Sequence, residues 1–115
     1  LRGDDPAAAA TVLLRRREAC RRELSVLCLD GVDQDGSAAA DLDRAALRSA
    51  QDGGELVADL VPAATDASPR LGERLGDSAL VTLTGGASML LVREGDGWRI
   101  RDLLGAPSSA GRTPG

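Results

Sequence analysis

The chain has 115 residues, with 14 basic and 18 acidic side chains, no His, and a formal net charge of −4 at pH 7. This length accommodates one domain with a modest core, and the acidic balance argues against binding to nucleic acid or anionic membranes. Without His, the commonest general base and zinc ligand is missing, so we predict no catalytic residues, no metal and no cofactor. No apolar run approaches the ~18 residues of a membrane span, so we expect no direct membrane insertion by this segment.

The composition also bears on the source and the compartment. All 14 basic residues are Arg, and Ala, Gly, Leu and Asp dominate the rest, a bias typical of GC-rich genomes that predicts an actinobacterial origin. The first residue is Leu1 rather than Met, so we expect a membrane anchor or a lipoprotein signal upstream.

A long helix is predicted near the beginning of the chain. Asp4 or Asp5 can cap it, Pro6 suits its first turn, and the apolar side chains from Ala7 to about Leu24 follow helical spacing. Five arginines lie on this helix, and we interpret them as a solvated face rather than a phosphate-binding or lipid-binding patch. They are Arg15, Arg16, Arg17, Arg21 and Arg22.

The two cysteines constrain how this helix ends. Cys20 and Cys28 are eight residues apart, which is ~12 Å along an unbroken helix and too far for a disulfide. A bridge therefore requires a break, and Ser25 can supply it by capping a second short helix, Val26 to about Asp33. We favour the disulfide over two reduced core thiols, because paired cysteines in a small domain indicate an oxidising compartment.

The segment after the second cysteine partly matches a calcium-binding loop. Asp33, Asp35 and Gly36 fall on its third, fifth and sixth positions, but Gly31 and Leu42 occupy the first and twelfth positions, where acidic ligands are needed. We therefore interpret the segment as a turn between helices.

A further helix is predicted from Ser37, a plausible cap, to about Ser49. Its expected inward residues are Leu42, Ala45, Ala46 and Leu47. Glu55 to Val61 remains ambiguous between strand and helix.

The rest of the chain predicts four sequential antiparallel strands, because glycine-rich turns separate short apolar segments. The expected strands are Arg70–Leu75, Ala79–Thr84, Ser88–Glu94 and Trp98–Leu104. The fold class is therefore α+β, with N-terminal helices packed on a curved antiparallel sheet of about four strands.

The turns suggest a register for the sheet. A two-residue loop between the second and third strands pairs Val81 with Leu90, and a three-residue loop between the third and fourth pairs Val92 with Ile100. This register leaves a second apolar face, covered either by another part of the chain or by a partner, most simply a second copy. The candidate interface residues on it are Leu80, Met89, Leu91, Leu103 and Arg101.

Few side chains are candidates for chemistry. Trp98, the sole aromatic residue, either fills the core or lines a ligand pocket. Four carboxylates could in principle project inward as a base with a raised pKa, but no Tyr or His is present to assist them, and we interpret them as surface groups. They are Asp41, Asp43, Asp59 and Asp66.

Three segments carry a resemblance to a known family: residues 75–81, 89–93 and 95–102, the last with the sequence GDGWRIRD. Together with the preceding helices, Pro6 to Leu104 resembles the nuclear transport factor two-like superfamily, the cystatin-like α+β cone. It is most similar to actinobacterial extracytoplasmic members, in which such a domain follows a membrane anchor or lipoprotein signal. The resemblance implies a cone whose interior is sometimes an active site and often only a core.

We therefore predict a disordered start at residues 1–5, one cystatin-like domain at 6–104 and a flexible tail at 105–115. The expected function is a non-catalytic interaction or dimerisation domain of an anchored, cell-envelope protein, with a protein partner or a second copy and no nucleic acid. The alternative is a small-molecule-binding or enzymatic member of the same fold that uses the cone interior.

Overall fold

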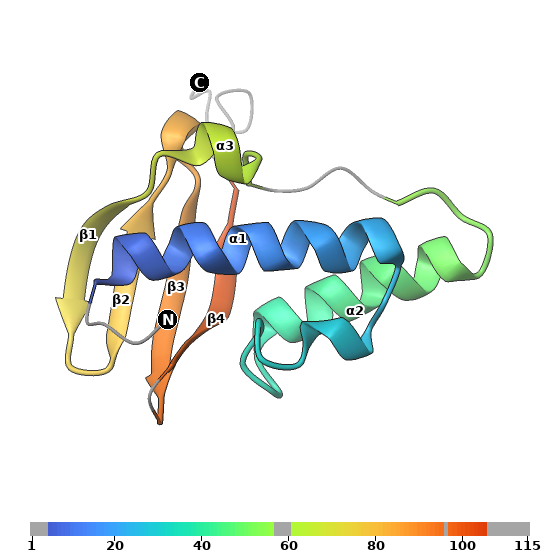
Figure 1. Ribbon diagram of the computed structural model, residues 1–115, viewed down its shortest axis with the longest axis horizontal. Coiled ribbons are helices and arrows are strands. Elements are labelled where there is room, and N and C mark those ends of the chain that lie inside the picture. Colours follow the sequence, from blue (N-terminus) through green and yellow to red (C-terminus); the bar gives the residue numbers. More distant parts are fainter. Residues whose placement is uncertain (1–4, 57–60, 96, 106–115) are drawn as a thin grey trace, which may run out of the picture.

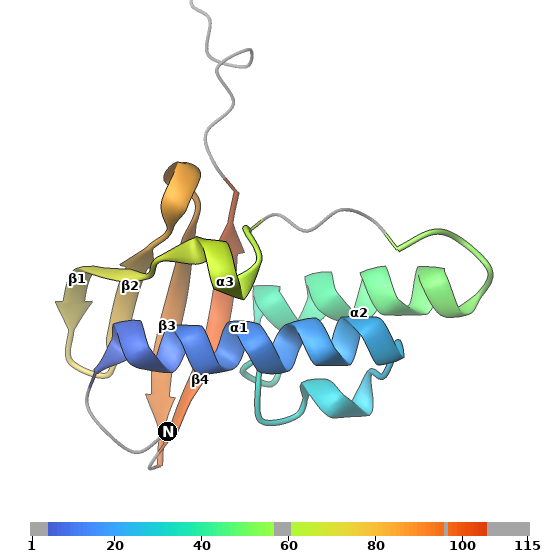
Figure 2. The ribbon, with the colours of Figure 1, turned by 45° about the horizontal axis from the view of Figure 1, so that its top comes forward.

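The structure is a computed structural model and describes residues 5–56, 61–95 and 97–105. In this part of the chain a long helix lies across one face of a four-stranded antiparallel sheet with strand order β1-β2-β3-β4, which confirms the predicted α+β fold. The elements are α1 Pro6–Glu23, α2 Ala38–Gln51, α3 Ala64–Ala67, β1 Arg70–Leu75, β2 Ser78–Thr82, β3 Ser88–Glu94 and β4 Gly97–Leu104. Figures 1 and 2 show α1 extending beyond β4 to run alongside α2.

Helix α1 begins where the sequence predicts. The carboxylate of Asp5 accepts hydrogen bonds from the backbone N–H groups of Ala7 and Ala8 (3.1 and 3.2 Å), and Pro6 occupies the first turn. Small and branched side chains then face the sheet, so the helix can approach it closely. They are Ala9, Ala10, Leu13 and Leu14, all at most 4% exposed.

The end of α1 confirms the predicted disulfide. Leu24 adopts a left-handed conformation (φ 52°) that stops the helix, and the Ser25 hydroxyl accepts a hydrogen bond from the N–H of Cys28 (3.2 Å). The chain reverses there, the Cα atoms of Cys20 and Cys28 come to 5.4 Å, and the two sulfurs are bonded. The predicted second helix is only a 3₁₀ turn, Leu27–Leu29.

The segment from Ser25 to Ser37, called the strap below, joins α1 to α2 along the edge of the sheet. The N–H of Ile100 donates to the carbonyl of Val32, and the N–H of Gln34 donates to the carbonyl of Ile100, both at 2.8 Å. The strap therefore satisfies backbone groups on the outer edge of β4 that would otherwise be open.

Helix α2 is confirmed, as is its cap, since the Ser37 hydroxyl accepts a hydrogen bond from the N–H of Ala40 at 3.1 Å. Of its four predicted inward residues, Ala46 and Leu47 are buried, at 8% and 0% exposed, but Leu42 is 39% exposed and Ala45 is exposed. The buried side runs instead through residues 39, 43 and 47, which are four apart and so lie on one helical face. Most of the ambiguous segment Glu55 to Val61 lies outside the described residues.

Strand β1 forms an open edge of the sheet, and every residue in it is exposed. A bulge at Gly72 interrupts its pairing with β2, and the strand carries Arg70, Glu73 and Arg74. Bulges and charged side chains of this kind discourage a second strand from pairing with an edge.

The predicted register between β2 and β3 is wrong by one residue. Val81 pairs with Met89 and Ala79 with Leu91. The connection is longer than two residues, because the Leu83 N–H donates to the carbonyl of Ala87 (2.8 Å) across a turn containing Gly85 at φ 85°. A shift of one residue moves every side chain of β3 to the opposite face.

The predicted register between β3 and β4 is also wrong. Gly97 pairs with Glu94, and Ile100 pairs with Leu91 rather than with Val92. A bulge then places both Arg101 and Asp102 opposite Leu90. The extra residue returns the following side chain to the core, where Leu103 is 3% exposed.

Candidate functional site

The corrected register changes which residues can form an interface. Met89, Leu91 and Leu103 are at most 3% exposed and pack in the core beneath α1, so they cannot meet a partner. Leu80 and Arg101, the other two predicted interface residues, do lie on the side of the sheet away from α1, where Leu80 is half-buried and Arg101 is exposed. The predicted second apolar face therefore exists, but most of its residues differ from those predicted.

We call this side the outward face. Its cross-strand rows contain Leu75, Ser78, Val92 and Arg99; Glu73, Leu80, Leu90 and Asp102; and Arg70, Thr82, Ser88 and Leu104. Leu75 is 72% exposed and Leu104 is 44% exposed, while Leu80, Leu90 and Val92 are half-buried. No helix among the described residues packs on this face, since α1 and α3 lie on the other side and α2 lies beyond β4.

Two shallow hollows meet on the outward face. The first has a volume of about 220 Å³ and is lined by Glu73, Leu75, Ser78, Ala79, Leu80 and Leu90. The second, of about 380 Å³, lies between the strap and β4 and is lined by Leu90, Arg101, Asp102 and residues 34–38. Leu90 lines both, so an apolar depression continues into a polar one. Small-molecule sites are usually clefts or cavities of about 300–1,000 Å³ that bury most of the ligand surface. Both hollows are instead open depressions, which would leave much of a ligand exposed.

Trp98, the candidate pocket residue, is in the core. It is 2% exposed, and the guanidinium of Arg74 lies 5.4 Å from its ring centroid. A third hollow, of about 320 Å³, lies near Ser68 and Thr84. Trp98 lines neither this hollow nor the two on the outward face. Of the two alternatives, Trp98 fills the core.

The four candidate carboxylates have different environments. Asp41 and Asp66 are exposed, as expected of surface groups, and Asp59 lies outside the described residues. Asp43 is completely buried, so its interpretation as a surface group is wrong. It belongs to a buried charge cluster that was not predicted from the sequence.

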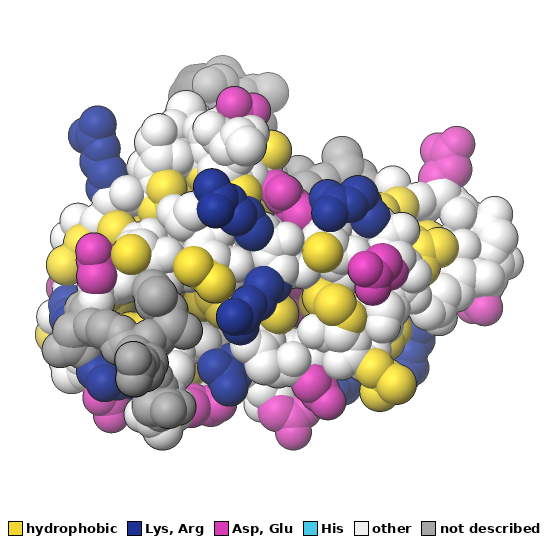
Figure 3. All heavy atoms as spheres, in the orientation of Figure 1, with side chains coloured by type: hydrophobic (Ala, Val, Ile, Leu, Met, Phe, Trp, Pro, Cys, Tyr) yellow, Lys and Arg dark blue, Asp and Glu magenta, His cyan; other side chains and the backbone are white. Residues whose placement is uncertain are grey.

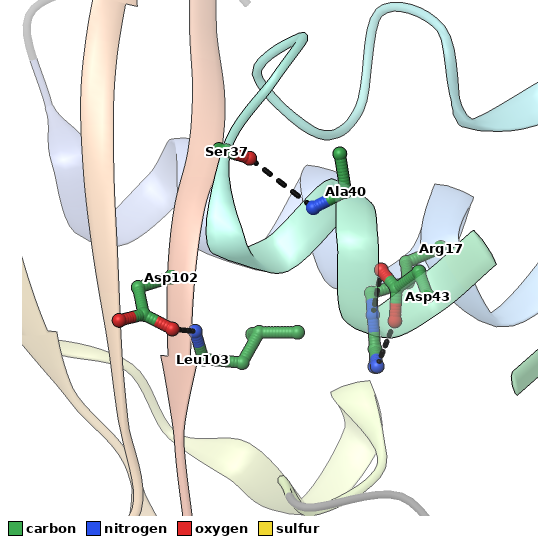
Figure 4. Close-up of polar contacts among 6 residues, drawn as sticks. All are labelled: Arg17, Ser37, Ala40, Asp43, Asp102 and Leu103. Carbon is green, nitrogen blue, oxygen red and sulfur yellow. Dashed lines mark hydrogen bonds and ion pairs between the residues drawn. The ribbon is translucent and has the colours of Figure 1, made fainter. Parts of the chain in front are cut away.

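That cluster joins α1 to α2. Arg17, which is 1% exposed, donates from Nε to Oδ2 of Asp43 at 2.9 Å and from Nη2 to Oδ1 at 2.7 Å (Figure 4). Two parallel charge-assisted hydrogen bonds of this kind fix both side chains in orientation as well as in distance. The interpretation of Arg17 as part of a solvated face is therefore wrong.

Asp33 of the strap adds a second carboxyl group to the cluster. It is 5% exposed, and neither of its oxygens accepts a hydrogen bond from any described residue. Burial, the hydrogen bond to Asp43 and the negative charge of Asp43 raise the pKa of Asp33 from 3.8 to about 9. At neutral pH Asp33 is therefore a neutral acid, which explains the missing donors, because its own O–H donates to Asp43.

The neighbouring carboxyl shifts in the opposite direction. Burial opposes the charge on Asp43, but the hydrogen bonds from Arg17 and Asp33, with the charges of Arg17 and Arg21, lower its pKa. One ionised and one protonated carboxyl group thus lie side by side, which is also how acid–base pairs are built in active sites. Here neither group lines any of the three hollows, and the cluster links α1, α2 and the strap.

A positional signal could have revealed this cluster. Arg17 is spaced three and four residues from Leu13, Leu14 and Cys20, which are all buried, and so it lies on the apolar face of its helix. A charged residue on such a face needs a buried partner of opposite sign, and Asp43 occupies the corresponding position on α2. The neighbouring arginines at residues 15, 16, 21 and 22 masked this signal, because they suggested a continuous charged face.

Three other arginines of α1 do form a surface, whereas Arg21 is half-buried. Arg15, Arg16 and Arg22 are exposed, and Figure 3 shows arginine side chains standing among apolar ones along this side of the molecule. The partial calcium motif does not assemble, since Asp33 points into the core while the Asp35 side chain is 96% exposed. Within residues 5–56, 61–95 and 97–105, no group of three or more metal-ligating side chains could hold an ion.

No described helix is long and apolar enough to cross a bilayer. Comparison with known proteins adds no relationship: no family model, no curated protein and no solved structure matches the chain. The likeness to the nuclear transport factor two-like superfamily therefore remains a prediction.

Proposed function

We propose that this chain is a non-catalytic, extracytoplasmic interaction domain of an anchored bacterial protein, and that it binds its partner with the outward face of the sheet. The observation that carries the proposal is the apolar strip along this face, Leu75, Leu80, Leu90, Val92 and Leu104, on which no described helix packs. An apolar strip rimmed by charged side chains is typical of a protein-binding surface.

Two further observations support the proposal. The disulfide between Cys20 and Cys28 suits an oxidising compartment outside the cytoplasm. The interior of the fold is filled by Trp98, Met89 and Ile100, each at most 2% exposed, which argues against a ligand site inside the cone. Membership of the extracytoplasmic nuclear transport factor two-like group belongs to the same proposal and rests on the sequence resemblance.

Photo-crosslinking in the producing cell tests this function. A photoreactive amino acid replaces Leu90, in the centre of the strip, in the protein expressed from its own gene. The matched control places it at Leu27, which is 82% exposed on the strap and lines neither hollow of the outward face. We expect a discrete crosslinked adduct from position 90 and none from position 27. No adduct at position 90, or the same adducts at both positions, would contradict the proposal.

A further inference from the structure

The strap is tied to α1 by a covalent bond and to β4 by hydrogen bonds. The disulfide joins Cys28, near the start of the strap, to Cys20 in the last turn of α1. Further along, the strap pairs with β4 at Ile100, through the carbonyl of Val32 and the N–H of Gln34. The disulfide therefore belongs to the same short segment that closes the outer edge of β4.

The chain reversal between the two cysteines has an unfavourable backbone conformation. Leu24 lies in the left-handed region, with φ 52° and ψ 41°. Glycine usually occupies this position after a helix, because a residue with a Cβ atom is strained there. The disulfide holds the reversal in place. Once the bond is broken, Leu24 is free to return to an ordinary conformation, so the strain favours release of the strap.

Asp33 is a second unfavourable feature of the closed strap. Its carboxyl group is 5% exposed beside Asp43, and burial is the main reason that its pKa is raised to about 9. An aspartic acid in water is ionised at neutral pH, so Asp33 must take up a proton to occupy this place. Leu29 and Val32 oppose release, because both are buried in the core. The packing of two apolar side chains is thus set against a strained turn and a buried acid, and the disulfide adds to the packing.

The two sulfurs differ in accessibility. Cys20 is fully buried, whereas Cys28 is half-buried and follows Leu27, which is 82% exposed. A dithiol reductant can therefore approach the disulfide at Cys28. Its thiolate attacks Sγ of Cys28 to form a mixed disulfide, while Sγ of Cys20 leaves and takes up a proton. The second thiol of the reductant then displaces Cys28 as a thiol and closes the reductant's own disulfide, so that two electrons and two protons reach the cysteines.

We propose that the Cys20–Cys28 disulfide is a redox switch for the strap: a dithiol reductant opens the bond, the strap leaves β4, and the N–H and carbonyl groups of Ile100 become unpaired. Reoxidation closes the strap again. A strand edge that is open in this way can pair with another extended segment, which the closed strap prevents at Ile100. The switch goes beyond the proposed function, because it does not depend on the outward face or on what binds there.

Amide hydrogen exchange, followed residue by residue by NMR, tests the switch on the whole chain before and after reduction with dithiothreitol. The reporters are the N–H groups of Ile100 and Gln34, which both donate across the contact between the strap and β4. The reference amides belong to β3, which lies between β2 and β4. We expect reduction to speed exchange of both reporters at least tenfold, because a disulfide that closes a short loop typically favours the closed state by this factor or more. In the reduced chain both reporters should also exchange at least tenfold faster than β3, since the opening is local.

The matched control is the double variant Cys20→Ser with Cys28→Ser, which should exchange like the reduced chain at both reporters, with or without dithiothreitol. Reoxidation of the wild type should return both reporters to their original rates. Equal exchange in the oxidised and reduced wild type overturns the switch, because the strap then stays closed without the disulfide. Reporters that exchange as fast as β3 in the reduced chain overturn it as well, because the whole fold then opens together. Reporters that stay fast after reoxidation show an irreversible opening, which is also not a switch.

Discussion

The two faces of the sheet are built from alternate residues of the same strands, yet their side chains have opposite environments. Leu91 is fully buried beneath α1, whereas Leu90 next to it is half-buried and lines both hollows of the outward face. The covered face is also held by polar groups, because the Arg17–Asp43 pair ties α1 to α2 at its margin. The difference teaches that apolar character alone does not identify the core of a thin sheet; the covering helix does.

The largest loss of unfolding free energy is expected from a substitution in the Arg17–Asp43 pair, at the margin of the covered face of the sheet. Asp43→Ala leaves the Arg17 guanidinium buried without its carboxylate, and loss of one partner of a buried ion pair typically costs 3–5 kcal/mol of unfolding free energy. Urea denaturation monitored by the fluorescence of Trp98 measures it. The paired variant Arg17→Met with Asp43→Leu removes both charges and should recover most of the loss. An Asp43→Ala cost below about 1 kcal/mol would mean that the pair does not hold the helices together.

The contrast between adjacent leucines tests the assignment of the two faces directly. Leu91→Ala creates a cavity in the core and should cost about 2–5 kcal/mol, whereas Leu90→Ala should cost less than about 1 kcal/mol. The same denaturation experiment compares them. The register predicted from the sequence requires the reverse order, so this pair decides between the two registers.

Those registers also show how far the sequence can be interpreted. Strand and helix positions followed from periodicity and caps, as at Asp5 and Ser37, because those signals are local. The register depended on loop geometry, and the glycines after Leu83 are compatible with a two-residue turn as well as with the wider turn observed. A single extra residue reverses every side chain of β3, so a small local error moved Met89 and Leu91 to the wrong face.

The candidate sites were predictable to different degrees. The disulfide could be predicted, because Ser25 can cap a turn where the helix must break. An apolar outward face was also expected, and Leu80 lies on it as predicted, whereas Met89, Leu91 and Leu103 are in the core. The buried cluster depends on Arg17, Asp33 and Asp43 meeting across three separate segments, which no local pattern records. Only the placement of charged residues on apolar helical faces pointed to it.

The smallest of the three effects on stability is its dependence on pH, which arises from Asp33 in the strap. Asp33 has a pKa of 3.8 in the unfolded chain and about 9 in the folded protein, where it faces Asp43 and Arg44 of α2 and Arg17 of α1. A raised folded pKa gives stability that is complete below the unfolded pKa and is lost progressively as pH rises through the folded value. Asp43 has the opposite shift, and its contribution is lost only as pH falls below its ordinary value.

We therefore expect the unfolding free energy to fall as pH rises between about 4 and 9, by up to roughly 1 kcal/mol per pH unit. Asp33→Asn should remove this slope, because the amide still donates to Asp43 but does not titrate. The matched control is Asp35→Asn, two residues further along the strap with a 96% exposed side chain, which should leave the slope unchanged. Denaturation curves at several pH values measure all three proteins. Equal slopes in the wild type and Asp33→Asn would mean that Asp33 is already ionised in the folded state, and that the covered face holds two buried negative charges against one arginine.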